Sequence, residues 1–337
     1  MNHNIVVLGA SAGGVAALST VCRGLPDDLP AALFVVLHVS PRAHSELPAI
    51  LSRAGPLQAC HAVDGERVCL GRIYVAPPDH HLLLDDSGDR TMLRCGPPEN
   101  RSRPAVDPLF RSAAVACGPR VIGVVLSGAL DDGAEGLSAI RRCGGITVVQ
   151  DPADAEWPDM PRHARERADA EHCYPAADLP ALLQRLARSI AGPSIPVPAE
   201  LALEVRISRR EIVAMGEEEI TVGTPSRLGC PECGGVLNLV GDEAAPRFRC
   251  QIGHAYGRKT LAAHQTETLE HALGVAFRTQ RDRRTLFQSM ERTAMQRKQA
   301  KMVSRRRNAA DEAQRSAEPI AAAIDELRRP AISPTDA

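Results

Sequence analysis

Polar residues of three types follow apolar segments of the sequence, and together they are the residues of a hydrolytic triad. Ser11 follows IVVLGA, His38 follows ALFVVL, and Asp131 and Asp132 follow VIGVVL within SGALDDG. A serine hydroxyl becomes a useful nucleophile only when an imidazole accepts its proton, and the imidazole needs a carboxylate to hold its tautomer. The sequence therefore predicts a Ser-His-Asp site, provided that the fold brings these segment ends together.

The glycine-rich turn GASAGG around Ser11 admits three uses: it could cradle a phosphate, present a nucleophile, or simply connect a strand to a helix. Ser11 stands where a dinucleotide-binding G-x-G-x-x-G turn has its second glycine, and no Gly-Lys-[Ser/Thr] of a P-loop follows. Taken singly, Ser11 could cap a helix and His38 could be a buried core residue. Their occurrence with an aspartate at three segment ends favours the nucleophile. The order Ser, His, Asp differs from that of α/β-hydrolases.

A second chemical motif consists of thiols and an imidazole. Cys230-Pro-Glu-Cys233 is followed by Cys250-Gln-Ile-Gly-His254, a spacing typical of a closed tetrahedral zinc site. Four protein ligands leave no open position for a reacting group, so we expect a structural Zn²⁺ and no cofactor for catalysis. Unrelated thiols near a histidine, or a redox Cys-x-x-Cys, are the alternatives.

The segments that must position the triad read as an α/β sheet. Continuous apolar runs are typical of strands covered on both faces, and ligands bind at the carboxyl ends of such strands. The runs lie at 5–9, 32–37, 121–126 and 146–149, and amphipathic segments at 14–23, 108–117 and 134–143 alternate with them. Residues 57–94, broken by Gly and Pro, predict a small antiparallel insertion. The expected fold class is α/β, a doubly wound, mostly parallel, Rossmann-like sheet.

The rest of the sequence divides into a linker and two further parts. A catalytic domain at 1–190 is followed by a Pro-rich linker at 191–198. Residues 199–257 form a mixed segment with the zinc-binding module, and residues 258–330 predict one or two long helices. From Arg258 to Arg307 there are 13 Lys or Arg against 4 Asp or Glu, so this helical tail is basic.

Composition argues against several classes of protein. The 337 residues have a net charge of −1, so no overall field favours nucleic acid, and only 3% are aromatic, which gives little support for stacking on bases. The basic tail by itself could bind nucleic acid, a partner helix or an acidic receptor surface, and nucleic acid is not the expected partner. No apolar run approaches the roughly 18 residues of a membrane span, and no signal-peptide pattern opens the sequence. The 10 cysteines lack a disulfide-like spacing. We therefore expect a cytoplasmic protein.

Six ordered motifs resemble the catalytic domain of CheB-type chemotaxis protein-glutamate methylesterases. They span about residues 3–190 and read GASAGG, LHVSP, GRIYVAPPDHHLLL, RPAVDPLFRSAA, LSGALDDGAEGL and DMPRHA. The resemblance implies hydrolysis of γ-glutamyl methyl esters on chemoreceptor helices, with release of methanol. In many members of the family it also implies deamidation of selected glutamines.

The resemblance also implies roles for the triad residues. It makes Ser11 the nucleophile, His38 the base and Asp132 the orienting acid, because the family's aspartate directly precedes a glycine, here Gly133. Asp131 is then expected to face solvent or to cap the following helix.

Further implied residues surround the reacting carbonyl. The backbone N–H groups of Ala12 and Ala129 are the implied oxyanion donors, and Met160 lies in a loop similar to one that borders the family's substrate site. The sequence departs from the family where Ala12 replaces a common Thr and where Ala129-Leu130 replaces Met-Gly. Because Leu130 tolerates fewer backbone angles than glycine, the second change is expected to affect the oxyanion loop.

Partners and control are expected as follows. The substrate would be a methylated chemoreceptor or a receptor-like helical protein. The family's typical N-terminal receiver domain has no counterpart in the sequence, so control would come from a separate receiver or signalling protein, or from the C-terminal half acting as a targeting or gating element. Because the triad precedes the linker, a chain that ends near Ala191 is expected to turn over a small ester. The rival interpretation is a non-catalytic scaffold with a degenerate esterase domain, and a solvated charged face is the simpler interpretation of the tail.

Overall fold

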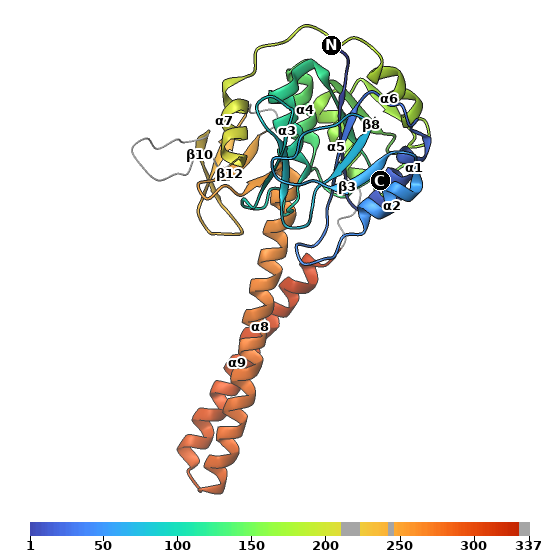
Figure 1. The fold of residues 1–337 in the computed structure, drawn as a ribbon. Coiled ribbons are helices and arrows are strands. Elements are labelled where there is room, and N and C mark those ends of the chain that lie inside the picture. The colour runs from blue at the N-terminus through green and yellow to red at the C-terminus, as the bar shows by residue number, and fades with distance from the viewer. Residues whose placement is uncertain (210–222, 242–245, 330–337) are drawn as a thin grey trace, which may run out of the picture. The chain divides into compact units, whose positions relative to one another are not determined.

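A computed structural model describes residues 1–209, 223–241 and 246–329 (Figure 1). The chain divides into two compact units, Met1–Leu261 and Ala262–Ala337. The first unit is built on a seven-stranded sheet in which every pair of neighbours is parallel. In spatial order the strands are β3 (Gln58–His61), β4 (Arg72–Val75), β2 (Ala32–Leu37), β1 (Ile5–Ala10), β7 (Val121–Val125), β8 (Ile146–Gln150) and β9 (His172–Tyr174).

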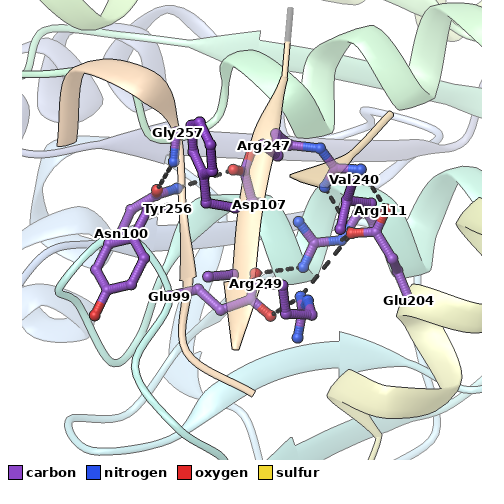
Figure 2. A pocket seen from close by; sticks show the side chains of 12 residues that line it. Glu99, Asn100, Asp107, Arg111, Glu204, Val240, Arg247, Arg249, Tyr256 and Gly257 are labelled. Atoms are coloured by element: carbon purple, nitrogen blue, oxygen red, sulfur yellow. Dashed lines mark hydrogen bonds and ion pairs between the residues drawn. The ribbon is translucent and has the colours of Figure 1, made fainter. Parts of the chain in front are cut away.

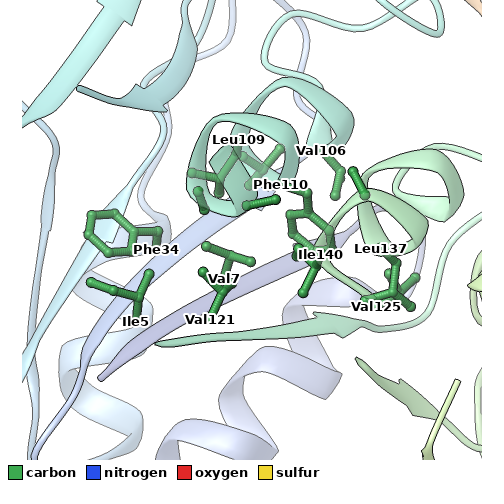
Figure 3. Close-up of a cluster of buried hydrophobic side chains, with 14 of the residues drawn as sticks. Ile5, Val7, Phe34, Val106, Leu109, Phe110, Val121, Val125, Leu137 and Ile140 are labelled. Atoms are coloured by element: carbon green, nitrogen blue, oxygen red, sulfur yellow. The ribbon is translucent and has the colours of Figure 1, made fainter. Parts of the chain in front are cut away.

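Helices cover both faces of this sheet, as the continuous apolar strands predict. One face packs against α1 (Gly14–Gly24), α2 (Leu47–Ala54) and α6 (Leu179–Ala187). The other face packs against α3 (Val106–Cys117), α4 (Ala134–Arg142) and α5 (Asp159–Ala168), where Phe110, Leu137 and Ile140 lie over the central strands (Figure 3). The predicted doubly wound α/β class is confirmed. A short 3₁₀ turn, η1 (Gly118–Arg120), leads from α3 into β7.

The antiparallel insertion is present but is shorter than the sequence suggested. Only β5 (His81–Leu84) and β6 (Thr91–Arg94) form an antiparallel pair. The earlier part of 57–94 supplies β3 and β4, which extend the parallel sheet at its edge. The prediction erred here because Gly and Pro mark local turns, whereas parallel pairing joins segments that are distant in sequence.

A second, smaller sheet follows the linker. Helix α7 (Ala199–Ser208) packs on α3, and four antiparallel strands come after it: β10 (Thr224–Gly229), β11 (Val236–Val240), β12 (Arg247–Cys250) and β13 (Ala255–Tyr256). This sheet has a small core of its own and lies within the first compact unit. The domain boundaries derived from the sequence stay a prediction. Residues 210–222 of the mixed segment 199–257 lie outside the described residues.

The basic tail forms two helices, α8 (Arg258–Gln296) and α9 (Ala300–Leu327), with a turn around Lys298. Within the second unit they run antiparallel, since Arg307 pairs with Glu291 near the turn and Arg328 pairs with Glu270 far from it. None of the helices in the described residues combines the length and the apolar character needed to cross a bilayer.

Candidate functional site

The register of the parallel sheet brings the candidate residues to one edge. Ala10 of β1 pairs with Leu37 of β2, so Ser11 and His38 leave adjacent strands side by side. The backbone N–H of Ser11 donates to the carbonyl of Ser127, which follows β7 on the other side of β1. The chain switches sides of the sheet between β1 and β7, and such a switch point is where α/β sheets bind ligands.

His38 and Asp132 are joined directly. The distance between Nε2 of His38 and Oδ2 of Asp132 is 2.6 Å, and the side chains are 17% and 2% exposed. A carboxylate at Nε2 fixes the proton on that nitrogen and leaves Nδ1 as the basic atom. Among the described residues, nothing else forms a hydrogen bond with Nδ1 of His38 or with the Ser11 hydroxyl.

Asp132 receives hydrogen bonds from several sides. Besides His38, it accepts from Nδ2 of Asn100 at 2.8 Å, and from the backbone N–H groups of Val106 at 2.7 Å and Asp107 at 3.2 Å. Val106 and Asp107 open helix α3, so the carboxylate also lies at the positive end of a helix dipole. These bonds hold the carboxylate in one orientation toward the imidazole.

Two buried carboxyl groups lie next to each other here, and their pKa values move in opposite directions. Burial alone would raise the pKa of Asp132, but the hydrogen bond and charge of His38, with the bonds from Val106 and Asn100, lower it below its usual value. Burial and the neighbouring charge of Asp132 raise the pKa of Asp107 well above its usual value. Asp132 is therefore the carboxyl group of this pair that carries the negative charge.

The predicted oxyanion donors lie in the two loops beside Ser11. Within the part of the chain that the structure describes, the N–H groups of Ala12 and Ala129 donate to no protein group. The hydroxyl of Ser127 ties the loops together, because it donates to the carbonyl of Ala12 at 2.8 Å and accepts from the N–H of Trp157 at 3.0 Å. Both donors are thus available to a ligand.

Met160 is placed differently from the expectation. It lies in the first turn of α5, not in a loop, and it is fully buried. Its N–H donates to the carbonyl of Gly128, and a Cβ on Gly128 would come within 2.0 Å of the Met160 sulfur and 2.9 Å of Ser11 Cβ. Met160 therefore packs beneath the loop after β7, and only glycine fits at position 128.

Of the two residues that replace the family's Met-Gly in the acid loop, Leu130 has an unusual backbone conformation. Leu130 has a φ of 67°, in the left-handed region that disfavours a leucine. Its carbonyl accepts a hydrogen bond from Nδ1 of His163 at 2.7 Å, which holds the turn. The expectation that Leu130 stands at a position suited to glycine agrees with this geometry.

Asp131 neither faces solvent nor caps the following helix α4, so that prediction was wrong. Its carboxylate accepts from the N–H groups of Lys259 at 3.0 Å and Thr260 at 3.2 Å, and also from the Thr260 hydroxyl. Asp131 thus caps the start of α8, which lies more than a hundred residues further along the chain. Helix caps can be recognised in sequence only when cap and helix are adjacent.

The four predicted metal ligands come together in the smaller sheet. The ligand atoms of Cys230, Cys233, Cys250 and His254 all lie within 4.8 Å of one another. Individual separations are 3.7 Å between the sulfurs of Cys233 and Cys250, and 3.4 Å between the Cys250 sulfur and Nδ1 of His254. A tetrahedral Zn²⁺ with bonds of about 2.3 Å to sulfur holds its ligand atoms about 3.7 Å apart. The cluster therefore fits such an ion.

Two tight turns present these ligands. The N–H of Gly234 donates to the carbonyl of Cys230, and the N–H of Gly253 donates to the carbonyl of Cys250. Both glycines have positive φ, 74° and 110°, which a residue with a side chain rarely adopts. Cys230 and Cys250 therefore each begin a tight turn, and their sulfurs lie in the cluster.

Comparison with known proteins decides the family. A model of the CheB methylesterase family matches residues 6–183. The chain belongs to the CheB methylesterase family. A relative from Leptospira interrogans is 37% identical over 187 residues, which cover 55% of this chain and 96% of the relative. The protein-glutamate methylesterase/protein-glutamine glutaminase 2 of Anaeromyxobacter dehalogenans is 40% identical over 184 residues, which cover 55% of this chain and 53% of that relative.

A solved member of the CheB family has the same fold. The crystal structure of the Thermotoga maritima CheB methylesterase catalytic domain aligns with a TM-score of 0.53 at 33% identity, covering 54% of this chain and 98% of that domain. The similarity identified from the six sequence motifs is thus confirmed, and with it the class of enzyme. The match ends at residue 183, so the small sheet with its Cys/His cluster lies outside the matched region.

Asn100, Ser127 and Gly128 belong to this site but were not singled out from the sequence. Ser127 could have been found, since it is the first polar residue after the β7 apolar run. Asn100 lies in an irregular segment between β6 and α3, and no local pattern distinguishes it.

Proposed function

We propose that this protein is a protein-glutamate methylesterase that uses Ser11, His38 and Asp132. The observation that carries the proposal is the 2.6 Å hydrogen bond between His38 and Asp132 beside a serine in a turn between a strand and a helix. With Nε2 engaged by the carboxylate, Nδ1 of His38 is the ring atom that can accept the Ser11 proton. The membership of the CheB methylesterase family supports the same chemistry.

The reaction would proceed in two halves. Oγ of Ser11 attacks the γ-carbonyl carbon of a glutamyl methyl ester while His38 takes the hydroxyl proton, and the N–H groups of Ala12 and Ala129 stabilise the oxyanion. The C–O bond to the methoxy group then breaks, and His38 donates its proton to give methanol. Water, deprotonated by His38, attacks the acyl-enzyme and releases glutamate and Ser11. An amide in place of the ester would release ammonia, which is glutamine deamidation.

The proposed substrate is a methylated, helical chemoreceptor-like protein, because relatives of the chain carry names of this activity. Zn²⁺ would be held by the Cys/His cluster and would serve the fold alone, since all four ligands come from protein. The basic tail would contact an acidic partner, and we expect no nucleic acid to bind. The predicted cytoplasmic location stays a prediction.

Release of methanol from methyl-labelled receptor tests this function. Wild-type protein should release it, and Ser11→Ala should lose all measurable turnover while keeping its circular dichroism spectrum, because no core is emptied. Ser19→Ala, on the exposed face of α1, is the matched control. Should Ser11→Ala retain most of the activity, the nucleophile is misassigned. Folded wild-type protein without turnover would favour the non-catalytic scaffold.

A further inference from the structure

Asn100 connects the Asp132 carboxylate to the segment that follows the metal cluster. Its amide nitrogen donates to Oδ1 of Asp132 at 2.8 Å and to Asp107 at 2.9 Å. Its amide oxygen accepts from the N–H of Gly257 at 2.8 Å, and its own N–H donates to the carbonyl of Ala255 at 2.8 Å. One side chain therefore joins the proposed catalytic carboxylate to residues that begin directly after His254.

The orientation of the Asn100 amide is determined by its partners. One N–H of the amide points at the Asp132 carboxylate and the other at an oxygen of the Asp107 carboxyl group, while the amide oxygen points at a backbone donor. A flipped amide would face oxygen against oxygen and N–H against N–H. Asn100 is buried and has a positive φ of 47°, a backbone conformation that asparagine adopts more readily than most residues. The residue is thus held in one position by both neighbours.

Asp131 makes a second connection from the same loop. Its carboxylate caps α8 through Lys259 and Thr260, and a Cβ on Gly257 would come within 2.3 Å of it. The segment 255–260 therefore forms hydrogen bonds with Asn100 and with Asp131, the residue directly before Asp132. A shift of this segment would displace both of these neighbours of Asp132.

Buried ion pairs fasten the small sheet to the proposed catalytic domain (Figure 2). Arg249 of β12 donates to Glu99 at 2.8 Å, and Glu99 also pairs with Arg111 of α3. Arg247 of β12 pairs with Glu135 of α4 at 3.3 Å, and it also pairs with Glu204 of α7, the helix that packs on α3. The cavity among these groups measures about 10 Å³, room for one water molecule at most. The sheet is packed onto the domain and is not loosely tethered.

The small sheet has an apolar core that includes two of the candidate metal ligands. This core consists of Cys230, Leu237, Phe248, Cys250, Tyr256 and Leu261. Such a core is too small to support a fold alone, and a structural metal is the usual replacement. Cys250 and His254 close the turn between β12 and β13, and β13 carries Ala255. Metal binding at this turn would thereby fix the segment that Asn100 contacts.

We propose that Asn100 is a positioning residue for the His38–Asp132 pair, and that metal bound by Cys230, Cys233, Cys250 and His254 maintains esterase activity by holding the 255–257 segment against Asn100. This inference rests on the proposed function. It gives the zinc module a structural role for the proposed active site, beyond the targeting or gating role expected from the sequence. The metal takes no part in the reaction and acts through Ala255, Gly257 and Asn100.

Metal removal tests the proposal on the full chain. Protein purified with Zn²⁺ is stripped with a strong chelator, checked by elemental analysis, and then given Zn²⁺ again. We expect kcat on a small methyl ester to fall at least about tenfold without metal and to return with it, with little change in KM. Cys233→Ser, at the most exposed ligand, should behave like stripped protein, whereas Cys69→Ser, at an exposed cysteine outside the cluster, should behave like wild type.

A spectroscopic measurement separates positioning from simple loss of fold. The proton on Nε2 of His38 should give a low-field ¹H NMR signal because its hydrogen bond to Asp132 is short. Asn100→Ala should shift or broaden this signal and lower kcat about tenfold, the effect expected for one hydrogen bond to a charged group. Metal removal should change the same signal. Asn308→Ala, on the exposed surface of α9, is the control, and Cys233→Ser keeps the test valid should Asn100→Ala not fold.

The outcomes are distinct. If metal-free protein keeps both its kcat and its His38 signal, metal binding does not support the His38–Asp132 pair and this inference is overturned. The proposed esterase function would stand in that case. Metal-loaded wild type that releases no methanol and is not labelled at Ser11 by a fluorophosphonate would overturn the proposed function instead. In that case the response of the His38 signal to metal removal still decides the inference.

Discussion

Nε2 of His38 lies 2.6 Å from the Asp132 carboxylate, although 94 residues separate them in the chain. The adjacent Asp131 instead accepts hydrogen bonds from the start of α8. Substitution of the two aspartates should therefore have different effects. Asp132→Asn keeps the shape but removes the charge that stabilises an imidazolium, so kcat should fall on the order of 10³- to 10⁴-fold. Asp131→Asn should change kcat by less than about threefold, because asparagine caps a helix as well as aspartate does.

Steady-state kinetics on a small methyl ester measures both variants. Asp131→Ala serves as a further comparison, since it removes the cap of α8 and should cost about 1 kcal/mol of stability. The reverse ranking of Asp131→Asn and Asp132→Asn would show that the orienting acid is misassigned.

Leu130→Gly should stabilise the protein. Leu130 has a φ of 67°, where a side chain is unfavourable and glycine is not, so the free energy of unfolding should rise by about 1 kcal/mol. Denaturant unfolding measures the change. Leu286→Gly is the contrasting control: Leu286 is an exposed residue inside α8, and the same substitution should there lower stability by about 1 kcal/mol. A loss of stability in both variants would mean that the left-handed turn is not strained.

The free energy of unfolding of the first unit should decrease at low pH. Burial alone would raise the pKa of Glu99 and of Glu204, but the neighbouring arginines lower both values below the usual range. A lowered pKa in the folded state means that the stabilisation is complete above the unfolded value of 4.5 and is lost as the pH falls through the folded value. The free energy of unfolding should therefore begin to fall as the pH drops below about 5 and should keep falling as the pH is lowered further.

The variant Glu99→Gln separates the contribution of Glu99 to the pH dependence of stability from the contribution of the other carboxyl groups. At neutral pH it should cost about 3–5 kcal/mol, because it leaves two buried arginines short of a charge. The difference from wild type should shrink as the pH falls below 4.5, whereas Glu166→Gln, at an exposed site on α5, should follow wild type throughout. A difference that stays constant with pH would exclude Glu99 as a source of the acid dependence.

Purified protein should contain one Zn²⁺ per chain. Elemental analysis measures the metal, and a thiol reagent reports the ligands: Cys69 and Cys95 should react at once, while Cys233 should react only after chelation, although all three are exposed. Protein that lacks zinc and whose Cys233 reacts as fast as Cys69 would argue against the metal site.

Truncation should show that the small sheet is not separable from the proposed active site. A chain ending at residue 272 keeps the contacts of Asn100 with Gly257 and of Glu99 with Arg249, and it should turn over a small ester. A chain ending near Ala191 loses these contacts and should lose activity and stability. This is the opposite of the expectation from sequence, and an active, folded short chain would restore that expectation.

The sequence by itself determined the main strands of the parallel sheet, the candidate triad residues that follow them and the candidate metal ligands. Apolar runs before Ser11, before His38 and before the aspartates predicted β1, β2 and β7, and the Cys/His spacing predicted the cluster. These signals are local: each lies within one strand, turn or pair of knuckles, where the side-chain pattern and the backbone conformation depend on the same few residues.

The tertiary structure alone decided which distant residues meet. It joined β3 and β4 to the parallel sheet, buried Met160 under the Gly128 loop and turned Asp131 toward α8. It also placed Asn100 between Asp132 and Gly257, a contact across more than 150 residues. Such contacts depend on strand register and on packing between helices and sheets, which are properties of the whole folded chain. For that reason no local pattern in the sequence could have revealed that Asn100 joins Asp132 of the proposed triad to the segment that follows the Cys/His cluster.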